Sequence, residues 1–204
     1  MTRGRRVFLG LAVLAAAGAA IALELFLEHG ISARDEPTAV EAFVARRLRH
    51  WAVPRGERDA ANPVAPTPEA LARARTHFAD HCASCHGNDG RGKTKIGQNL
   101  YPKAPDMTLA DTQRLSDGEI FYIIENGVRL TGMPAWGEAG AHDATESWEL
   151  VHFIRHLPKV TADELAEMES MNPKSQMQMK EEEEMRQFLE GGEPSGPPLS
   201  GHKH

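Results

Sequence analysis

Both cysteines of the chain lie in one five-residue segment, Cys82-Ala83-Ser84-Cys85-His86, and the sequence has no others. Four kinds of structure use two thiols at this spacing: a structural disulfide, a redox dithiol, half of a zinc site, and the double attachment of a haem. The group that this segment holds is therefore the strongest constraint on what the rest of the chain can fold around.

The surrounding sequence favours the haem. A thioredoxin-like dithiol needs a strand-helix-strand context, and no alternating pattern of useful length is present. Zinc needs further thiolates or a paired histidine motif. On a helical turn, Cys82 and Cys85 can form thioether bonds to the two vinyl groups of one haem, and His86 then reaches the iron from the same side. The segment predicts one covalently bound haem c, with the structural disulfide as the open alternative.

Composition agrees with a small core that a bound group completes. Only 6% of the residues are aromatic, and the mean hydropathy is −0.44. The net charge is −6, and residues 162–204 carry 4 Lys or Arg against 10 Asp or Glu. This balance argues against nucleic acid as the partner, because binding phosphates needs a basic face.

Residues 1–30 predict a membrane anchor. Three arginines precede an uncharged run from Val7 to Leu23, and apolar residues resume as far as Leu27. Residues 7–27 are long enough to span a bilayer. The positive-inside rule then places the N-terminus in the cytoplasm and the remainder on the periplasmic side of the inner membrane. The small residues between Ala15 and Ala22 also offer cleavage sites, so a removed signal peptide is the alternative.

Residues 31–66 predict an amphipathic helix followed by a linker. Val40, Phe43, Val44, Leu48 and Trp51 recur at helical spacing after Pro37. Either this helix lies on the membrane surface with its arginines toward lipid phosphates, or it packs on the globular domain. Residues 52–66 are rich in Pro and serve as a linker or an extended wrap.

Residues 67–160 predict an all-α domain with long loops. One helix starts at the cap Thr67 and runs into the cysteines; a second is capped by Ser116 and stops at Gly127; a third ends at Pro158. Residues 161–204 form an acidic tail that contains methionines, and we expect little packed structure beyond about residue 170.

A second iron ligand determines how a haem is used, and Met133 is the strongest candidate. It lies in a loop between two predicted helices, where Gly132 permits close approach to the porphyrin and Pro134 stiffens the chain. Met107 is a weaker candidate for the second iron ligand. The tail methionines, Met168 among them, have no obvious route to the iron.

Together these motifs resemble those of class I c-type cytochromes, in particular the single-haem, membrane-anchored bacterial kind. The resemblance rests on the helix before C-x-x-C-H, the "CHGNDGRG" turn, the G-x-N-L run at 97–100, the helix "LSDGEIFYIIENG", the loop "GMPAW" and the final "W-x-L-V-x-F-I" helix. It covers about half of the chain and implies a three-helix fold around one haem.

The resemblance implies further contacts. The first and last helices should cross with Ala74 and Phe78 against Leu150 and Phe153. The proximal His86 should donate its second ring N–H to a loop carbonyl that usually belongs to a proline. Gln98 occupies that position here, which implies a less rigid loop and makes Pro102 or Pro105 alternative anchors. Candidates for the haem-pocket wall are Tyr101, Phe121, Tyr122, Ile123, Ile124 and Trp136.

The expected function is single-electron transfer by Fe(II)/Fe(III) cycling with His86 and Met133 as axial ligands. The chain would be a carrier, or a subunit of an oxidoreductase complex, with no small-molecule substrate. Its partners would be an oxidase, reductase or dehydrogenase, reached by swinging on the linker. Two alternatives remain: a haem-based gas sensor or catalyst with a labile Met133, and a copper-handling protein that uses the Met- and His-containing tail.

Overall fold

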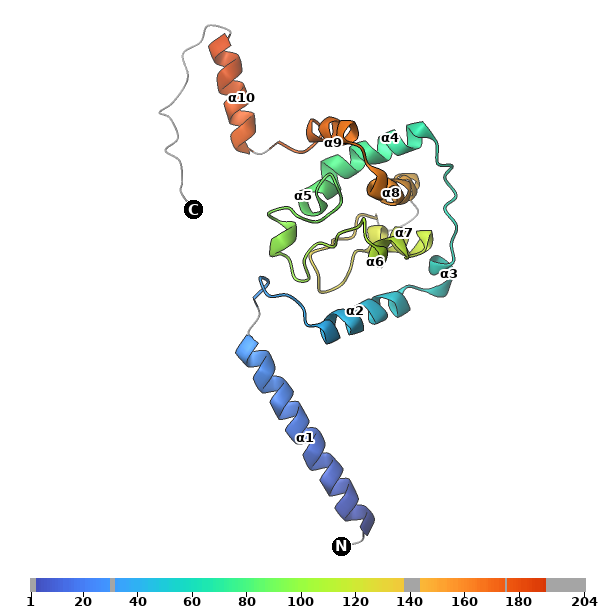
Figure 1. Ribbon diagram of the computed structural model, residues 1–204, viewed down its shortest axis with the longest axis vertical. Helices are drawn as coiled ribbons and strands as arrows, with labels where there is room; N and C mark the ends of the chain where they lie inside the picture. Colours follow the sequence, from blue (N-terminus) through green and yellow to red (C-terminus); the bar gives the residue numbers. More distant parts are fainter. Residues whose placement is uncertain (1–2, 30–31, 138–143, 175, 190–204) are drawn as a thin grey trace.

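The computed structural model describes residues 3–29, 32–137, 144–174 and 176–189, and every regular element in these ranges is helical (Figure 1). In chain order the elements are α1 (Arg3–His29), α2 (Ala39–Ala52), α3 (Arg55–Arg58), α4 (Pro68–His77), a π-helical turn (Phe78–Cys82), α5 (Ala83–His86), a 3₁₀ turn (Gly97–Asn99), α6 (Ala110–Gln113), α7 (Asp117–Asn126), α8 (Thr145–His156), a second 3₁₀ turn (Leu157–Lys159), α9 (Ala162–Glu169) and α10 (Gln176–Leu189). The expected all-α class is confirmed.

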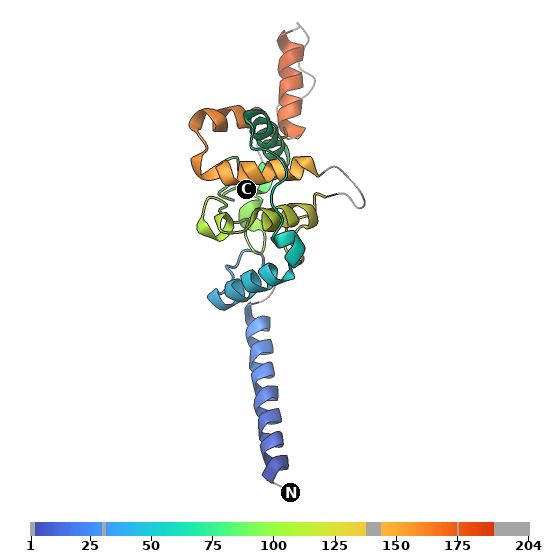
Figure 2. The same ribbon diagram turned by 90° about the vertical axis from the view of Figure 1, so that its right-hand side faces the viewer.

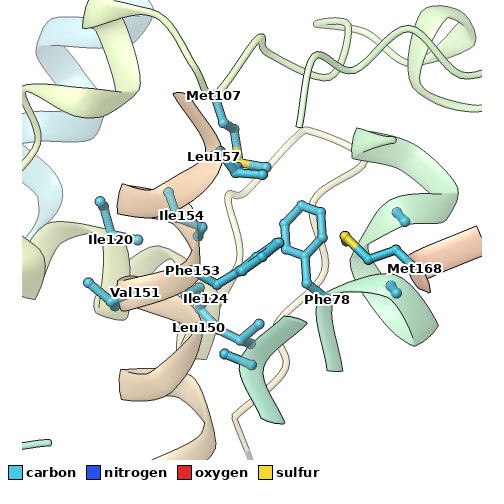
Figure 3. Packing of buried hydrophobic residues seen from close by; sticks show 13 residues of the cluster. Phe78, Met107, Ile120, Ile124, Leu150, Val151, Phe153, Ile154, Leu157 and Met168 are labelled. Carbon is cyan, nitrogen blue, oxygen red and sulfur yellow. The ribbon is translucent and has the colours of Figure 1, made fainter. Parts of the chain in front are cut away.

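Helices α4 and α8 cross at the centre of the body. Helix α4 begins as predicted, with the Thr67 hydroxyl accepting a hydrogen bond from the Ala70 amide at 3.1 Å. Ala74 is buried in the core cluster, and the rings of Phe78 and Phe153 lie 5.0 Å apart (Figure 3). The predicted crossing of the first and last domain helices is present, and it fixes the direction from which the chain enters the cysteine segment.

Helix α7 ends where the Met133 loop begins. Its capping box is complete: Ser116 Oγ accepts from the Glu119 amide at 3.1 Å, and Glu119 Oε2 accepts from the Ser116 amide at 2.9 Å. At the other end Gly127 adopts a φ of 64°, and a Cβ there would lie 2.6 Å from the Pro134 carbonyl carbon. Only glycine allows the loop to fold back so closely.

The domain extends beyond the predicted boundary at residue 160. Met168 of α9 is fully buried against Phe78 in the core cluster (Figure 3). Glu164 accepts hydrogen bonds from Arg75 of α4 and contacts His156 Nε2. The prediction that Met168 belongs to a solvated tail was wrong. Met168 is the one buried residue of a short helix that also carries four acidic residues, so the sequence there gives little indication of packing.

The N- and C-terminal helices project from this body in Figure 1. Helix α1 contains a 23-residue stretch, Arg3–Leu25, that is long and apolar enough to cross a membrane. Helix α10 carries the exposed Met179 and Met185. The Met177 side chain and the terminal His202 and His204, which the copper hypothesis also used, lie outside the described residues.

Residues 32–66 pack along the body and do not form a free linker. Helix α3 lies so close to α7 that a Cβ at Gly118 would be 1.9 Å from the Glu57 carbonyl oxygen. Farther on, the Asn62 amide donates to the Trp148 carbonyl at 2.9 Å, and the His152 ring contacts the Val64 carbonyl at 2.8 Å. The structure shows the extended wrap for this segment. Swinging of the domain on the whole of residues 31–66 would have to break these contacts, and it stays a prediction.

Candidate functional site

The cysteine segment lies on a distorted helical turn at the end of α4. Cys82 closes the π-helical turn, and Cys85 and His86 belong to α5, which ends at Gly87 with a φ of 73°. Both thiols are free and partly buried. Burial raises the pKa of Cys82 to about 12, and the neighbouring Cys85 adds to the shift. The structural disulfide left open by the sequence is absent from this structure, and Cys82 is a neutral thiol.

His86 is held as a neutral imidazole. Burial lowers its pKa, and the backbone carbonyl of Pro105 opposes this shift. Nδ1 is buried, and its approach to Pro105 falls outside the geometry of a full hydrogen bond. Nε2 has no hydrogen-bond partner among the described residues. A neutral ring with one nitrogen facing a carbonyl and the other unengaged is the arrangement in which histidine ligates a metal.

The loop after His86 is bonded back onto the cysteine segment. The Gly92 amide donates to the His86 carbonyl at 2.7 Å, and the Thr94 hydroxyl donates to the Cys85 carbonyl at 3.0 Å. A Cβ at Gly97 would lie 2.2 Å from the Cys85 carbonyl oxygen, so glycine is required there. These contacts fix the backbone of the residues that would hold a haem.

Gln98 is hydrogen-bonded to the loop that precedes it. Its side chain is exposed, and Nε2 donates to the Gly92 carbonyl at 2.8 Å. The amide of Ala104 also donates to the Gly97 carbonyl at 2.9 Å. Side-chain and backbone hydrogen bonds therefore cross-link the loop without a proline at position 98. The lower rigidity that the resemblance implied stays a prediction.

Met133 lies on a hydrogen-bonded loop. Its carbonyl accepts from the Val128 amide at 3.1 Å, and its own amide donates to the Thr131 hydroxyl at 3.1 Å. The side chain is partly buried. A Cβ at Gly132 would lie 2.6 Å from Leu100 Cδ2. Gly132 thus lets the Met133 loop meet the loop that follows His86, whereas the sequence had suggested an approach to the porphyrin.

The rival methionine has a different environment. Met107 is 7% exposed and lies in the core cluster beside Leu157 (Figure 3). Its amide donates to the Gly90 carbonyl at 2.8 Å. Packing in the core accounts for the burial of Met107.

The aromatic candidates for the pocket wall divide into two groups. The ring of Trp136 lies 5.3 Å from that of His81, directly before Cys82, and is 41% exposed. Phe121 instead stacks on Trp148 at 3.9 Å, and Ile124 is buried in the core cluster. Trp136 is therefore the aromatic residue that the fold brings to the cysteine segment, whereas Phe121 packs between helices.

Tyr101 and Pro102 lie at the surface. The Tyr101 hydroxyl donates to Glu41 Oε1 of α2 at 2.8 Å, and this bond raises the pKa of Tyr101. Tyr101 is 37% exposed, and Pro102 is exposed as well. Sequence reasoning missed the contact between Tyr101 and Glu41, since nothing in the sequence pairs residues so far apart.

The residues present fit a covalently bound haem. Two free thiols and an imidazole lie together on one short helical segment, and burial favours the neutral form of both Cys82 and His86. This is the donor set that thioether attachment and iron ligation require. Within the described residues, no group of three or more His, Cys, Asp or Glu side chains could hold a metal ion by itself.

Comparison with known proteins agrees with this geometry. Residues 69–154 match the model of a family described as cytochrome c oxidase, cbb3-type, subunit III. The chain is also 39% identical over 95 residues to the cbb3-type cytochrome c oxidase subunit FixPc of Rhizobium leguminosarum bv. viciae. That alignment covers 45% of this chain and 30% of the relative. Residues 69–154 therefore form a c-type cytochrome domain, which follows an N-terminal apolar helix.

Proposed function

We propose that the chain is a membrane-anchored electron carrier with one haem c attached through Cys82 and Cys85. The observation that carries the proposal is the placement of two free cysteines beside the partly buried His86, whose pKa burial lowers, within a segment that matches c-type cytochromes. When bound, the haem supplies reversible one-electron exchange between Fe(II) and Fe(III).

The chain's own residues orient and protect that group. His86 and Met133 would supply the two protein ligands of the haem iron. The hydrogen bonds of Gly92 and Thr94 hold the His86 segment, and those of Val128 and Thr131 hold Met133. Because both loops are fixed before any change of charge, they need little rearrangement during electron transfer. The Pro105 carbonyl faces the imidazole and would keep its orientation and basicity.

The proposed location is the inner membrane, with the domain on the periplasmic side. The apolar helix α1 follows three arginines, as in a segment inserted with its N-terminus in the cytoplasm. The relative named above is an oxidase subunit. We therefore propose a terminal oxidase as the electron acceptor and a quinol-oxidising complex or dehydrogenase as the donor.

Spectroscopy and extraction test the covalent haem. The reduced protein should show the spectrum of a low-spin c haem, and the haem should stay with the chain in acidified organic solvent. A Cys82→Ala, Cys85→Ala variant should lose its haem to the solvent. Free extraction of haem from the unaltered chain would refute covalent attachment. Rapid reduction of an oxidase by the reduced protein would then test the carrier role.

A further inference from the structure

Helix α2 presents its apolar side chains away from the protein. Val40, Phe43, Val44, Leu48 and Trp51 are between 45% and 72% exposed. Four of them, with Arg47, line a shallow groove along the helix. An amphipathic helix on a soluble domain normally buries this face. In α2 the apolar face is uncovered, so something outside the described chain must cover it.

The opposite, polar face of α2 fixes this orientation. Glu41 accepts from Tyr101, Arg46 pairs with Asp111 at 3.7 Å, and His50 contacts Glu119.

Arg49 is also drawn in on this side: burial lowers the pKa of its guanidinium, and Asp111 and Glu119 oppose the shift. To turn the apolar face inward, the helix would have to break these contacts and leave Glu119, which is 5% exposed, without its partner. The apolar face therefore stays outward.

The position of α2 identifies what covers it. In Figures 1 and 2, α2 lies at the end of the body from which α1 projects, and it runs across the direction of α1. Nine residues, 30–38, separate the two helices. An extended chain spans about 3.4 Å per residue, so α2 starts within roughly 30 Å of the end of α1. A bilayer crossed by α1 is thus always within reach of α2.

We propose that the lipid bilayer covers this face, with α2 lying in the headgroup region parallel to the membrane surface. The groove contains no acidic side chain, because the helix's one acidic residue, Glu41, faces Tyr101. Arg47 lies over the Phe43 ring at 5.3 Å, and its guanidinium can reach lipid phosphates while the stem stays on the apolar face. Trp51 has the amphipathic ring favoured at membrane interfaces. The cytochrome domain would then rest on the membrane in one orientation.

Controlled cleavage tests this proposal, which rests on anchoring by α1. A protease site is inserted after Ala33, and the full haem-loaded protein is reconstituted in vesicles of phosphatidylethanolamine and phosphatidylglycerol. Before cleavage, the fraction of protein that stays on the vesicles measures anchoring by α1. After cleavage, the fraction of the released domain that stays on the vesicles measures binding by α2. We expect the released domain to stay on the vesicles. A Phe43→Asp, Leu48→Asp variant should lower its bound-to-free ratio by at least about ten-fold.

A matched control makes the same chemical change on another exposed helix. Met185→Asp, Leu189→Asp alters two exposed apolar residues of α10 and should leave retention after cleavage unchanged. The haem spectrum checks the folding of every variant. Release of the unaltered domain to the same extent as the α2 variant would overturn the proposal.

A depth measurement identifies the occupant independently. In the haem-loaded protein Cys82 and Cys85 are both bonded to the haem, so Leu48→Cys supplies a single thiol for a spin label. Ser170→Cys, at the exposed residue that follows α9, supplies the control. Oxygen concentrates in the bilayer, whereas a water-soluble nickel complex stays outside it. The label at Leu48 should therefore be more accessible to oxygen, and the label at Ser170 should be more accessible to the nickel complex. A Leu48 label that is aqueous in pure lipid but protected in native membranes would identify a partner protein instead. Spin–spin broadening that grows with protein density would identify a second copy. Either result would refute the bilayer as occupant.

Discussion

His50 of α2 and Glu119 of α7 are in direct contact, with Nδ1 2.5 Å from Oε1. Glu119 also closes the capping box of α7 through its second oxygen and is 5% exposed. One buried carboxylate therefore both starts a domain helix and holds the helix that leads to the membrane anchor. The orientation of α2 and the start of α7 are thus coupled.

A double-mutant cycle should detect this coupling. Glu119→Ala removes the side-chain half of the capping box and the partner of His50, and we expect it to lower the free energy of unfolding by about 2 kcal/mol. His50→Ala alone should cost less, because the cap remains. The coupling between the two, measured by denaturant unfolding of the haem protein, should be about 0.5–1.5 kcal/mol. If the loss of unfolding free energy in the double variant equalled the sum of the losses in the two single variants, the contact between His50 and Glu119 would contribute nothing to stability.

The orientation of α2 could not have been predicted from its own residues. The spacing of Phe43, Leu48 and the other apolar residues defines which side chains share a face, and this was predicted correctly. Which face turns inward depends on Tyr101, Asp111 and Glu119, which lie far along the chain. Periodicity carries no information about such distant polar partners.

The central domain was predictable because local signals agreed with the packing. Thr67 and Ser116 cap the helices that their sequences indicate, and Gly127 ends α7. Cys82 and His86 were identified as candidates from spacing alone, and the haem site that they form stays a prediction. Burial of Met168 was not predicted, since a single buried methionine in a polar helix leaves no periodic pattern.

Shortening Met168 should destabilise the domain. The side chain is fully buried, and Met168→Ala should lower the free energy of unfolding by about 2–4 kcal/mol through lost burial and a cavity. Met185→Ala, on the exposed face of α10, should change it by less than about 0.5 kcal/mol. Thermal unfolding followed at the haem absorption would compare them. If Met168→Ala lowered the free energy of unfolding no more than Met185→Ala does, α9 would not unfold together with the rest of the domain.

Replacing Met133 and Met107 one at a time should show which methionine ligates the iron and which only packs in the core. Met133→Ala should abolish the thioether-to-iron absorption band and lower the reduction potential by on the order of 0.1–0.3 V, because axial ligands set haem potentials over about 0.8 V. Met107→Ala should keep the band and lower stability by about 2–4 kcal/mol, since Met107 is buried in the core. Loss of the band in the Met107 variant would reverse the ligand assignment.

A methyl group at Gly97 should impair haem attachment. It would lie 2.2 Å from the Cys85 carbonyl oxygen and 2.7 Å from that of Gly92, and neither backbone atom can yield cheaply. Gly97→Ala should therefore reduce the yield of haem-loaded protein several-fold, measured by haem staining against total protein. Gly56→Ala, where a Cβ meets nothing within 4 Å, is the matched control and should load normally. Normal loading of Gly97→Ala would show that the loop is not fixed as described.

The carboxylate of Glu164 should make stability depend on acidic pH. Burial raises its pKa, but hydrogen bonds from Thr161 and His156 outweigh this and hold the pKa at about 2, below the ordinary 4.5. The unfolded chain therefore binds this proton more readily than the folded one. The stabilisation is complete above about pH 5 and is lost as the pH falls from 4.5 toward 2.

Glu164→Gln removes this charge, which also pairs with Arg75. We expect it to lower the free energy of unfolding at pH 7 by about 1–2 kcal/mol, well under the full linkage value because the pair is partly solvated. Between pH 5 and 3 the variant should lose less stability than the unaltered protein. Glu169→Gln, at the exposed end of α9, should follow the unaltered curve. Denaturant titrations at several pH values would distinguish these outcomes, and parallel curves for the Glu164 variant and the unaltered protein would contradict the assignment. Parallel curves would also argue against the ion pairs of Glu164 with Arg75 of α4 and His156 of α8 as the contacts that hold α9 to these helices.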